Sequence, residues 1–178
     1  MDQAALLADA VSTPYAAVVH TAQVHMGNTV AVWGVGGVGA HLVQLSKLAG
    51  AVPVIAVDLN DAVLERAKRL GADYAFRSDD PDLMKKIEDI TDGRMVDIAF
   101  DAVGIQPTLR ACVESLDING KAVSIGLSPQ NIDAGTFLEF NLKKKQLLGH
   151  LGYKRQDIAR LADMLSYGRL DLTESISK

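Results

Sequence analysis

Residues 29–50 read TVAVWGVGGVGAHLVQLSKLAG, and this stretch decides the fold. It begins with a short β-branched and apolar run that ends in glycine, which is typical of a buried strand. Apolar residues then recur at helical spacing over residues 37–49, which predicts a helix. Between the two lies the string of residues 34–39, which follows the pattern G-x-G-x-x-G. A strand, a glycine loop and a helix in this order predict the first βα unit of a doubly wound α/β domain.

The same alternation of short apolar runs and helical patterns continues along the chain. We expect strands at residues 29–34, 52–58, 73–76, 95–104, 121–126 and 145–151. The helices expected between and after them cover residues 37–49, 62–70, 81–90, 107–116 and 156–167. Continuous apolar strands separated by helices predict a parallel sheet that is covered on both faces. Right-handed crossovers then give the fold class as α/β, a doubly wound parallel six-stranded sheet (Rossmann fold) of order 3-2-1-4-5-6.

The composition is that of an ordinary globular protein. The chain has 178 residues, of which 48% are hydrophobic and 22% charged, and these values rule out disorder. A net charge of −4, without any run of more than three basic residues, argues against a nucleic-acid or anionic-membrane partner. No apolar block is long enough to span a membrane, and the first residues lack the pattern of a signal peptide. A single cysteine, Cys112, excludes an internal disulfide, and we expect a reducing, cytoplasmic location.

The glycine string predicts a binding site for a dinucleotide. Gly34 permits the tight turn after the strand, Gly36 lets the backbone approach a pyrophosphate, and Gly39 lets the helix pack closely on the strand. The amide groups at the start of the helix, at Gly37 and Val38, are expected to bind the phosphates together with the helix dipole.

An acidic residue indicates which dinucleotide binds. Asp58 lies 19 residues after Gly39, at the end of the second expected strand. A carboxylate there can accept hydrogen bonds from both hydroxyls of the adenine ribose, and it repels a 2′-phosphate, so we predict NAD rather than NADP. The alternative is that Asp58 only caps the following helix, but Asn60 or Asp61 is better placed to do so.

Other ligand classes fit the sequence less well. A phosphate-binding P-loop would need Gly-Lys-Ser/Thr, which is absent. A methyltransferase that binds a methyl donor would have alternate glycines after an acid, whereas Val38 breaks that spacing and Trp33 stands in the acid's place. No tyrosine is followed four residues later by lysine, as short-chain dehydrogenases require. The motifs therefore indicate the cofactor but not the reaction.

Several strings resemble the zinc-dependent medium-chain alcohol dehydrogenases: STPYAAVVHTAQVHMGNTVAVWGVGGVGAHLVQLSKLAGA, AVD, AKRLGADYAF, DIAFDAVG and GKAVSIG, in the family's order. The resemblance implies an NAD-binding Rossmann domain at residues 26–178, preceded at 1–25 by a connecting helix from a catalytic domain. It also implies an oxidoreductase that uses NAD and zinc to convert an alcohol to an aldehyde or ketone. The Cys and His-Glu zinc motifs of the family are missing from this sequence. We therefore expect a piece of such an enzyme, one that binds NAD but does not oxidise alcohols alone.

The resemblance assigns roles to residues outside the glycine loop. Asp9 occupies the place of a zinc ligand, and Thr13 matches a position near the nicotinamide that we take as catalytic. The alternative for Asp9 is a solvated acid on a helix. Cofactor contacts are implied after the fourth and fifth strands, at Val103, Gly104, Ile125, Gly126 and Leu127. The alternative there is ordinary turn chemistry.

The partners implied by the resemblance are a small-molecule alcohol or carbonyl substrate and a second copy of the chain. The homodimer would form through the last strand near Leu147. Two other functions stay open. A zinc-free quinone or enoyl reductase of the same superfamily would commonly prefer NADPH, against the evidence of Asp58. A stand-alone nucleotide-sensing regulatory domain would not need the segment from Asp9 to Thr13.

Four further features carry weaker expectations. His41 lies on the helix after the glycine loop and could approach a phosphate, and His150 is expected within the last strand. Cys112 is expected to be a buried apolar side chain rather than a nucleophile. Residues 143–145, three consecutive lysines, are expected to form a solvated turn.

Overall fold

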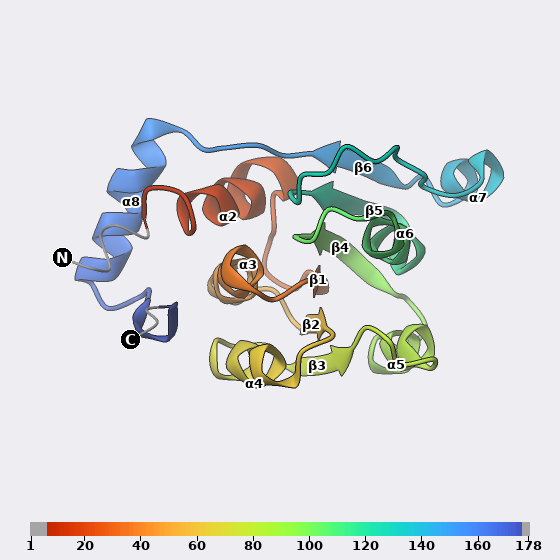
Figure 1. The fold of residues 1–178 in the computed structure, drawn as a ribbon, viewed down its shortest axis with the longest axis horizontal. Coiled ribbons are helices and arrows are strands. Elements are labelled where there is room, and N and C mark those ends of the chain that lie inside the picture. Colours follow the sequence, from red (N-terminus) through yellow and green to blue (C-terminus); the bar gives the residue numbers. More distant parts are fainter. Residues whose placement is uncertain (1–6, 176–178) are drawn as a thin grey trace.

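The computed structural model describes residues 7–175, which build a parallel sheet with helices on both faces (Figure 1). The strands are β1 (Val30–Trp33), β2 (Val54–Asp58), β3 (Tyr74–Arg77), β4 (Val96–Asp101), β5 (Leu116–Ser124) and β6 (Gln146–Gly149). Their spatial order is β3-β2-β1-β4-β5-β6, and every neighbouring pair is parallel. This topology confirms the expected fold class and strand order.

The helices fall on the two faces of the sheet. They are α2 (Ser12–Ala16), α3 (Gly37–Leu48), α4 (Asp61–Arg69), α5 (Leu83–Ile90), α6 (Gln106–Glu114), α7 (Phe137–Leu142) and α8 (Arg155–Ser166). A π-helix, η1 (Ala17–Ala22), continues α2, and a 3₁₀ turn, η2 (Thr173–Ser175), follows α8. Helices α2, α3, α4 and α8 lie on one side of the sheet, and α5 and α6 lie on the other (Figure 1). No helix within residues 7–175 is both long and apolar enough to cross a membrane.

The core consists of one apolar cluster on each face of the sheet. In β1, Val30 and Val32 belong to the cluster under α3 and α4, whereas Ala31 and Trp33 belong to the cluster under α5 and α6. All four side chains are buried. This is why the central strands are continuously apolar: side chains alternate between faces, and both faces are covered.

Most expected elements are confirmed within two or three residues, and the differences have local causes. The fourth strand ends at Asp101 instead of residue 104, because Gly104 has a φ of +82° and belongs to a turn. The fifth strand begins at Leu116, with a register shift against β4, so the preceding helix stops at Glu114. Helix α7 was not expected, since it is only 6 residues long and buries none of its side chains.

Residues 1–25 were expected to form a connecting helix. Within this segment, the structure is helical over residues 12–22, which form α2 and η1. Residues 1–6 of that segment lie outside the described residues. Helix α2 packs against α3 and α8, so it is tied to helices that come later in the chain. The π-helix ends at Gln23, whose φ of 56° is left-handed.

The expectation of a solvated turn at residues 143–145 is wrong for Lys145. Its side chain is only 1% exposed, and its ammonium group donates to the carbonyl oxygen of Val113 at 2.6 Å and to Glu139 Oε1 at 2.9 Å. The neighbouring ammonium holds the pKa of Glu139 below its usual range. The run of three lysines wrongly predicted a fully solvated turn, because the chain turns inward at the start of β6 and the third lysine faces α6.

His150 lies one residue beyond β6 instead of within it, although its amide still donates to the carbonyl of Ser124 across the sheet edge. Cys112 is fully buried, as expected, and burial raises the pKa of its thiol. His41 is also buried, and its Nε2 lies 3.2 Å from Ser175 Oγ in the η2 segment. That contact directs His41 Nε2 toward the C-terminal segment.

The buried His41 predicts that the chain loses stability in mild acid. Burial lowers the pKa of His41 from 6.5 to about 4. The unfolded chain therefore takes up this proton first, so the stability is present above pH 6.5 and is lost as the pH falls toward 4. From pH 7 to pH 5 we expect the unfolding free energy to fall by about 2 kcal/mol through this residue. Urea denaturation at both pH values checks this.

The comparison for that measurement is the His41→Gln variant, which cannot titrate. Burial lowers the pKa of His150 as well, so the wild type carries a second acid-sensitive histidine. The difference between wild type and variant isolates the contribution of His41. Equal losses of stability in the two proteins between pH 7 and pH 5 would contradict this prediction.

Candidate dinucleotide site

The glycine loop lies at the carboxyl edge of the sheet, between the ends of β1, β2 and β4. Strand β1 is in the middle: β2 and β3 follow on one side of it, and β4, β5 and β6 on the other. The chain therefore reverses its direction of winding next to β1. In doubly wound sheets the crevice at this switch point is where ligands bind.

The three glycines of the motif are required for three different reasons. Gly34 has a φ of +82°, and a Cβ there would lie 2.4 Å from Val103 Cγ2. A Cβ on Gly39 would lie 1.7 Å from the carbonyl oxygen of Gly34, so α3 and β1 approach too closely for any side chain. A Cβ on Gly36 would meet nothing within 4 Å. The open space beside Gly36 is what an approaching pyrophosphate needs.

The amides at the start of α3 are available for an anion. Within the described part of the chain, the N–H groups of Gly36, Gly37 and Val38 have no acceptor, and no side chain caps the helix. Unpaired amides at a helix N-terminus, together with the helix dipole, attract negative charge. The helix is 12 residues long, enough for its dipole to be fully developed at this end.

Asp58 lies directly beside the glycine loop. Its Oδ2 accepts a hydrogen bond from the amide of Val35 at 2.8 Å, and its Oδ1 accepts one from the amide of Asn60 at 2.9 Å. Asn60 itself caps α4 by accepting from the amide of Ala62 at 2.9 Å. The capping role thus belongs to Asn60, and each oxygen of Asp58 keeps a lone pair for a further donor, such as a ribose hydroxyl.

An apolar cavity of about 250 Å³ adjoins Asp58 between the ends of β2 and β4. Its lining includes Trp33, Val57, Leu59, Val103, Ile105 and Thr108. Side chains of this kind suit a flat aromatic ring, while the carboxylate at the rim suits the sugar attached to it.

The ends of β4 and β5 are held together by Asp101, a residue that sequence reasoning missed. Its buried Oδ1 accepts from the amides of Val103 and Gly104 and from Thr108 Oγ1, at 2.9 to 3.1 Å. Its carbonyl oxygen accepts from the amides of Ile125 and Gly126. The signal that could have revealed it is an acid at the end of an apolar strand, two residues before a valine–glycine turn.

The two strand-end turns are also in direct contact. A Cβ on Gly126 would lie 2.2 Å from the amide nitrogen of Gly104. The structure therefore brings together four of the residues expected after β4 and β5: Val103, Gly104, Ile125 and Gly126. Leu127 follows them and is 79% exposed.

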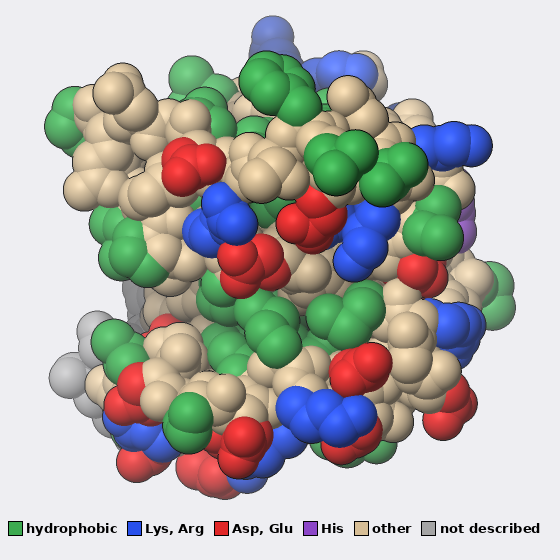
Figure 2. Space-filling view, turned by 90° about the vertical axis from the view of Figure 1, so that its right-hand side faces the viewer, with side chains coloured by type: hydrophobic (Ala, Val, Ile, Leu, Met, Phe, Trp, Pro, Cys, Tyr) green, Lys and Arg blue, Asp and Glu red, His purple; other side chains and the backbone are tan. Residues whose placement is uncertain are grey.

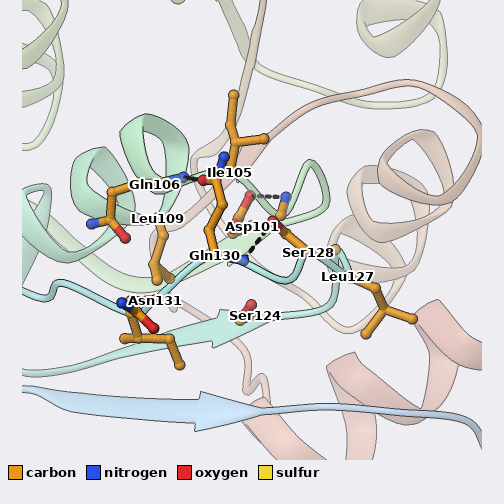
Figure 3. Close-up of a pocket in the computed structure, with 12 residues that line it drawn as sticks. Asp101, Ile105, Gln106, Leu109, Ser124, Leu127, Ser128, Gln130 and Asn131 are labelled. Atoms are coloured by element: carbon orange, nitrogen blue, oxygen red, sulfur yellow. Dashed lines mark hydrogen bonds between the residues drawn. The ribbon is translucent and has the colours of Figure 1, made fainter.

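A second cavity, of about 180 Å³, lies between the start of α6 and the loop after β5 (Figure 3). The side chain of Gln130, from the loop, points toward the start of α6, where the backbone amide of Gln106 donates to Gln130 Oε1 at 3.0 Å. The floor includes Asp101 and Ser124. Among residues 7–175, the buried Oδ2 of Asp101 has no hydrogen-bond partner.

Thr13 lies beside the carboxyl end of β6, where it contacts His150, which comes 137 residues later in the sequence. Its carbonyl oxygen accepts from His150 Nε2 at 3.1 Å, and His150 Nδ1 lies 2.8 Å from Thr21 Oγ1. A carbonyl oxygen only accepts, so Nε2 of His150 carries a proton and donates; burial lowers the pKa of His150, and in the neutral ring Nδ1 accepts from the Thr21 hydroxyl. Sequence reasoning missed this role of His150, because nothing local connects it to Thr13.

A zinc ion does not fit the described residues by themselves. Asp9 is exposed, and its Oδ1 accepts from Thr13 Oγ1 at 2.8 Å. Residues 7–175 contain no cluster of three or more His, Cys, Asp or Glu side chains that could hold a metal. Since catalytic zinc takes three protein ligands, one carboxylate is not a zinc site, and the role of Asp9 stays a prediction.

Comparison with known proteins decides the family. The family model described as zinc-binding dehydrogenase matches residues 37–167, most of the chain. The chain belongs to the zinc-binding dehydrogenase family. Membership confirms the resemblance drawn from the sequence motifs. The match starts at Gly37, so the first two glycines of the loop precede it.

Individual zinc-binding dehydrogenases agree with this assignment. A sorbitol dehydrogenase of Bacillus subtilis (strain 168) is 33% identical over 121 residues, which cover 66% of this chain and 34% of that protein. An alcohol dehydrogenase from Thermus sp. ATN1 superposes with a TM-score of 0.89 at 25% identity, covering 96% of this chain and 49% of that one. The benzyl alcohol dehydrogenase from Acinetobacter calcoaceticus superposes with a TM-score of 0.86 at 28% identity, covering 92% of this chain and 46% of that one. The chain thus spans about a third to a half of the length of these relatives.

Proposed function

We propose that this chain is the NAD-binding part of a zinc-dependent alcohol dehydrogenase, which oxidises an alcohol to an aldehyde or ketone. The observation that carries the proposal is the glycine loop, with its unpaired amides, next to the carboxylate of Asp58. Family membership supports the oxidoreductase class. Relatives named for sorbitol, alcohol and benzyl alcohol support a small-molecule alcohol as the substrate class.

Each part of the site has a task in holding the dinucleotide. The amides of Gly36, Gly37 and Val38 bind the pyrophosphate, Asp58 binds the adenine ribose, and the apolar cavity beside it takes the adenine. The turns after β4 and β5 hold the nicotinamide half, through Val103, Gly104, Ile125, Gly126 and Leu127. NAD, when bound, supplies the acceptor for a hydride. The chain orients that acceptor, and we expect it to bind NAD without oxidising an alcohol by itself.

The remaining roles are part of the same proposal. Thr13, placed by His150 at the end of β6, lies near the nicotinamide, and Asp9 serves as one zinc ligand. Further zinc ligands are needed beside Asp9, and residues 7–175 contain no cluster of His, Cys, Asp or Glu that could supply them. Residues 1–25 then connect to the part that holds the catalytic machinery, and residues 26–178 form the cofactor domain. A cytoplasmic location completes the proposal.

A second copy of the chain is the proposed protein partner. Strand β6 is an edge of the sheet, and Leu147 and Leu148 in it are only partly buried. An apolar edge strand left without a neighbour favours pairing across a two-fold axis. The face seen in Figure 2 carries acidic and basic side chains interspersed around hydrophobic ones.

The Gly36→Ala variant tests the pyrophosphate site. The new methyl group meets nothing within 4 Å in the free protein, so the thermal unfolding midpoint is expected to stay unchanged. The same methyl group occupies the space into which the pyrophosphate must come. We expect the Kd for NADH to rise by about tenfold or more, measured by titration of NADH fluorescence. A variant that folds normally and binds NADH as tightly as wild type would refute this placement of the pyrophosphate.

A further inference from the structure

Arg66, on α4, lies against the glycine loop on the side of its carbonyl groups. Its Nη2 donates to the carbonyl oxygen of Gly36 at 2.6 Å and to that of Val35 at 3.1 Å. Its Nε is buried and has no partner within the described residues. The ion pairs of residues 7–175 do not include Arg66. A partly buried cation without a paired carboxylate therefore lies next to a loop with unpaired amides.

The two hydrogen bonds determine how the loop amides point. In a trans peptide the C=O and the following N–H belong to one planar group and point in opposite directions. The carbonyls of Val35 and Gly36 point to Arg66, so the amides of Gly36 and Gly37 point away from it. These amides are among those without an acceptor at the start of α3. Arg66 thus holds the peptide groups 35–36 and 36–37 with their donors turned outward.

The charge of Arg66 strengthens these amides as donors. A hydrogen bond from a guanidinium to a carbonyl is charge-assisted, and it polarises the whole peptide group, including its N–H. The positive charge of Arg66 also acts on His41 in the neighbouring α3. Burial is the main cause that lowers the pKa of His41 to about 4, and the charge of Arg66 lowers this pKa further by a smaller amount. His41 is therefore neutral at pH 7, and the positive charge near the loop comes from Arg66.

We propose that Arg66 is a positioning residue for the cofactor diphosphate: it acts through the carbonyls of Val35 and Gly36 to orient and polarise the loop amides. The inference rests on the proposed function of the loop as a dinucleotide site. Arg66 does not touch the cofactor in this account. The peptide groups 35–36 and 36–37 lie between Arg66 and the bound diphosphate, and through them the positive charge of Arg66 offsets the negative charge of the diphosphate. A merely structural brace between α4 and the loop would affect stability but would not distinguish ligands with and without phosphate.

The test compares Arg66→Met and Arg66→Lys with wild type, and uses Lys68→Met as the matched control. Lys68 lies on the same helix, where its ammonium pairs with Glu65 at 2.7 Å instead of with the loop. Its loss removes the same charge without touching the loop. Kd values for NADH and for adenosine, which lacks phosphate, are measured by amide chemical-shift titration. Thermal unfolding of each variant is recorded alongside.

The expected result is selective for phosphate. Arg66→Met raises the Kd for NADH by about tenfold, leaves the Kd for adenosine within about twofold, and shifts the amide protons of Gly36 and Gly37 upfield in the free protein. Arg66→Lys, which keeps a cation and a donor, restores part of the NADH affinity, and Lys68→Met matches wild type. If Arg66→Met does not fold, Arg66→Lys decides, through the same selective weakening of NADH over adenosine on a smaller scale.

Three outcomes would overturn the proposal. They are unchanged NADH affinity in both Arg66 variants, equal weakening of NADH and adenosine, and an equal effect of Lys68→Met. Failure of the proposed function is distinguishable, because wild type would then bind neither NADH nor adenosine. In that case the positioning role falls together with the function.

Discussion

Replacing Gly39 with alanine is expected to lower the unfolding free energy by about 4 kcal/mol and to abolish NADH binding. A Cβ at this position would lie 1.7 Å from the carbonyl oxygen of Gly34 and 2.8 Å from its carbonyl carbon. Both atoms are backbone, so no side chain can move aside to relieve the overlap. Helix α3 and strand β1 would have to separate, and the loop between them would lose its shape. Urea denaturation and NADH titration measure the two effects.

Gly37→Ala is the matched control for stability. It makes the same chemical change two residues away, at the first residue of α3, where a Cβ would meet nothing within 4 Å. Alanine favours the helix over glycine, so the unfolding free energy is expected to stay the same or to rise by up to about 1 kcal/mol. Similar stabilities for the two variants would show that α3 does not need its close approach to β1.

Asp58→Asn is expected to weaken NADH binding by about tenfold to a hundredfold while it improves the binding of NADPH relative to NADH. In the proposed site, the carboxylate accepts hydrogen bonds from both hydroxyls of the adenine ribose and repels a 2′-phosphate. An amide can accept only through its single oxygen and carries no charge. The variant also loses one of the two acceptors for the amides of Val35 and Asn60, so its stability must be measured as well.

Asp61→Asn is the comparison for the charge of Asp58. Asp61 is an exposed acid at the start of α4 that pairs with Arg77 at 3.0 Å. Its replacement changes the net charge equally but leaves the carboxylate beside the glycine loop in place. NADH and NADPH affinities of this variant should match wild type. If Asp58→Asn keeps the wild-type preference between the two cofactors, the specificity assigned to Asp58 is wrong.

The fold was predictable from sequence because its signals are local. The central strands are buried on both faces, so they appear as unbroken apolar runs, and the glycine loop marks a turn where side chains are excluded at Gly34 and Gly39. Asn60 at the start of α4 is likewise a local signal. Helix α7 has no buried face, so no hydrophobic period could reveal it.

The supporting residues of the site were not predictable, because their contacts join distant parts of the chain. Arg66 reaches Gly36 across 30 residues, and His150 reaches Thr13 across 137. Lys145 is buried although it directly follows two further lysines in the sequence. In each case the residue type permits many roles, and only the packing of helices onto the sheet selects one. For Asp101, the sequence indicated a position at the end of a strand but gave no sign of the hydrogen bonds that its side chain accepts.

The most direct test of the central claim is a titration of the wild-type chain with NADH and with NADPH under the same conditions. We predict saturable binding of NADH, with a Kd at least about tenfold lower than that for NADPH, because Asp58 in the proposed site accepts the ribose hydroxyls and repels a 2′-phosphate. Absence of saturable NADH binding, or tighter binding of NADPH, would contradict the assignment of this chain as an NAD-binding domain.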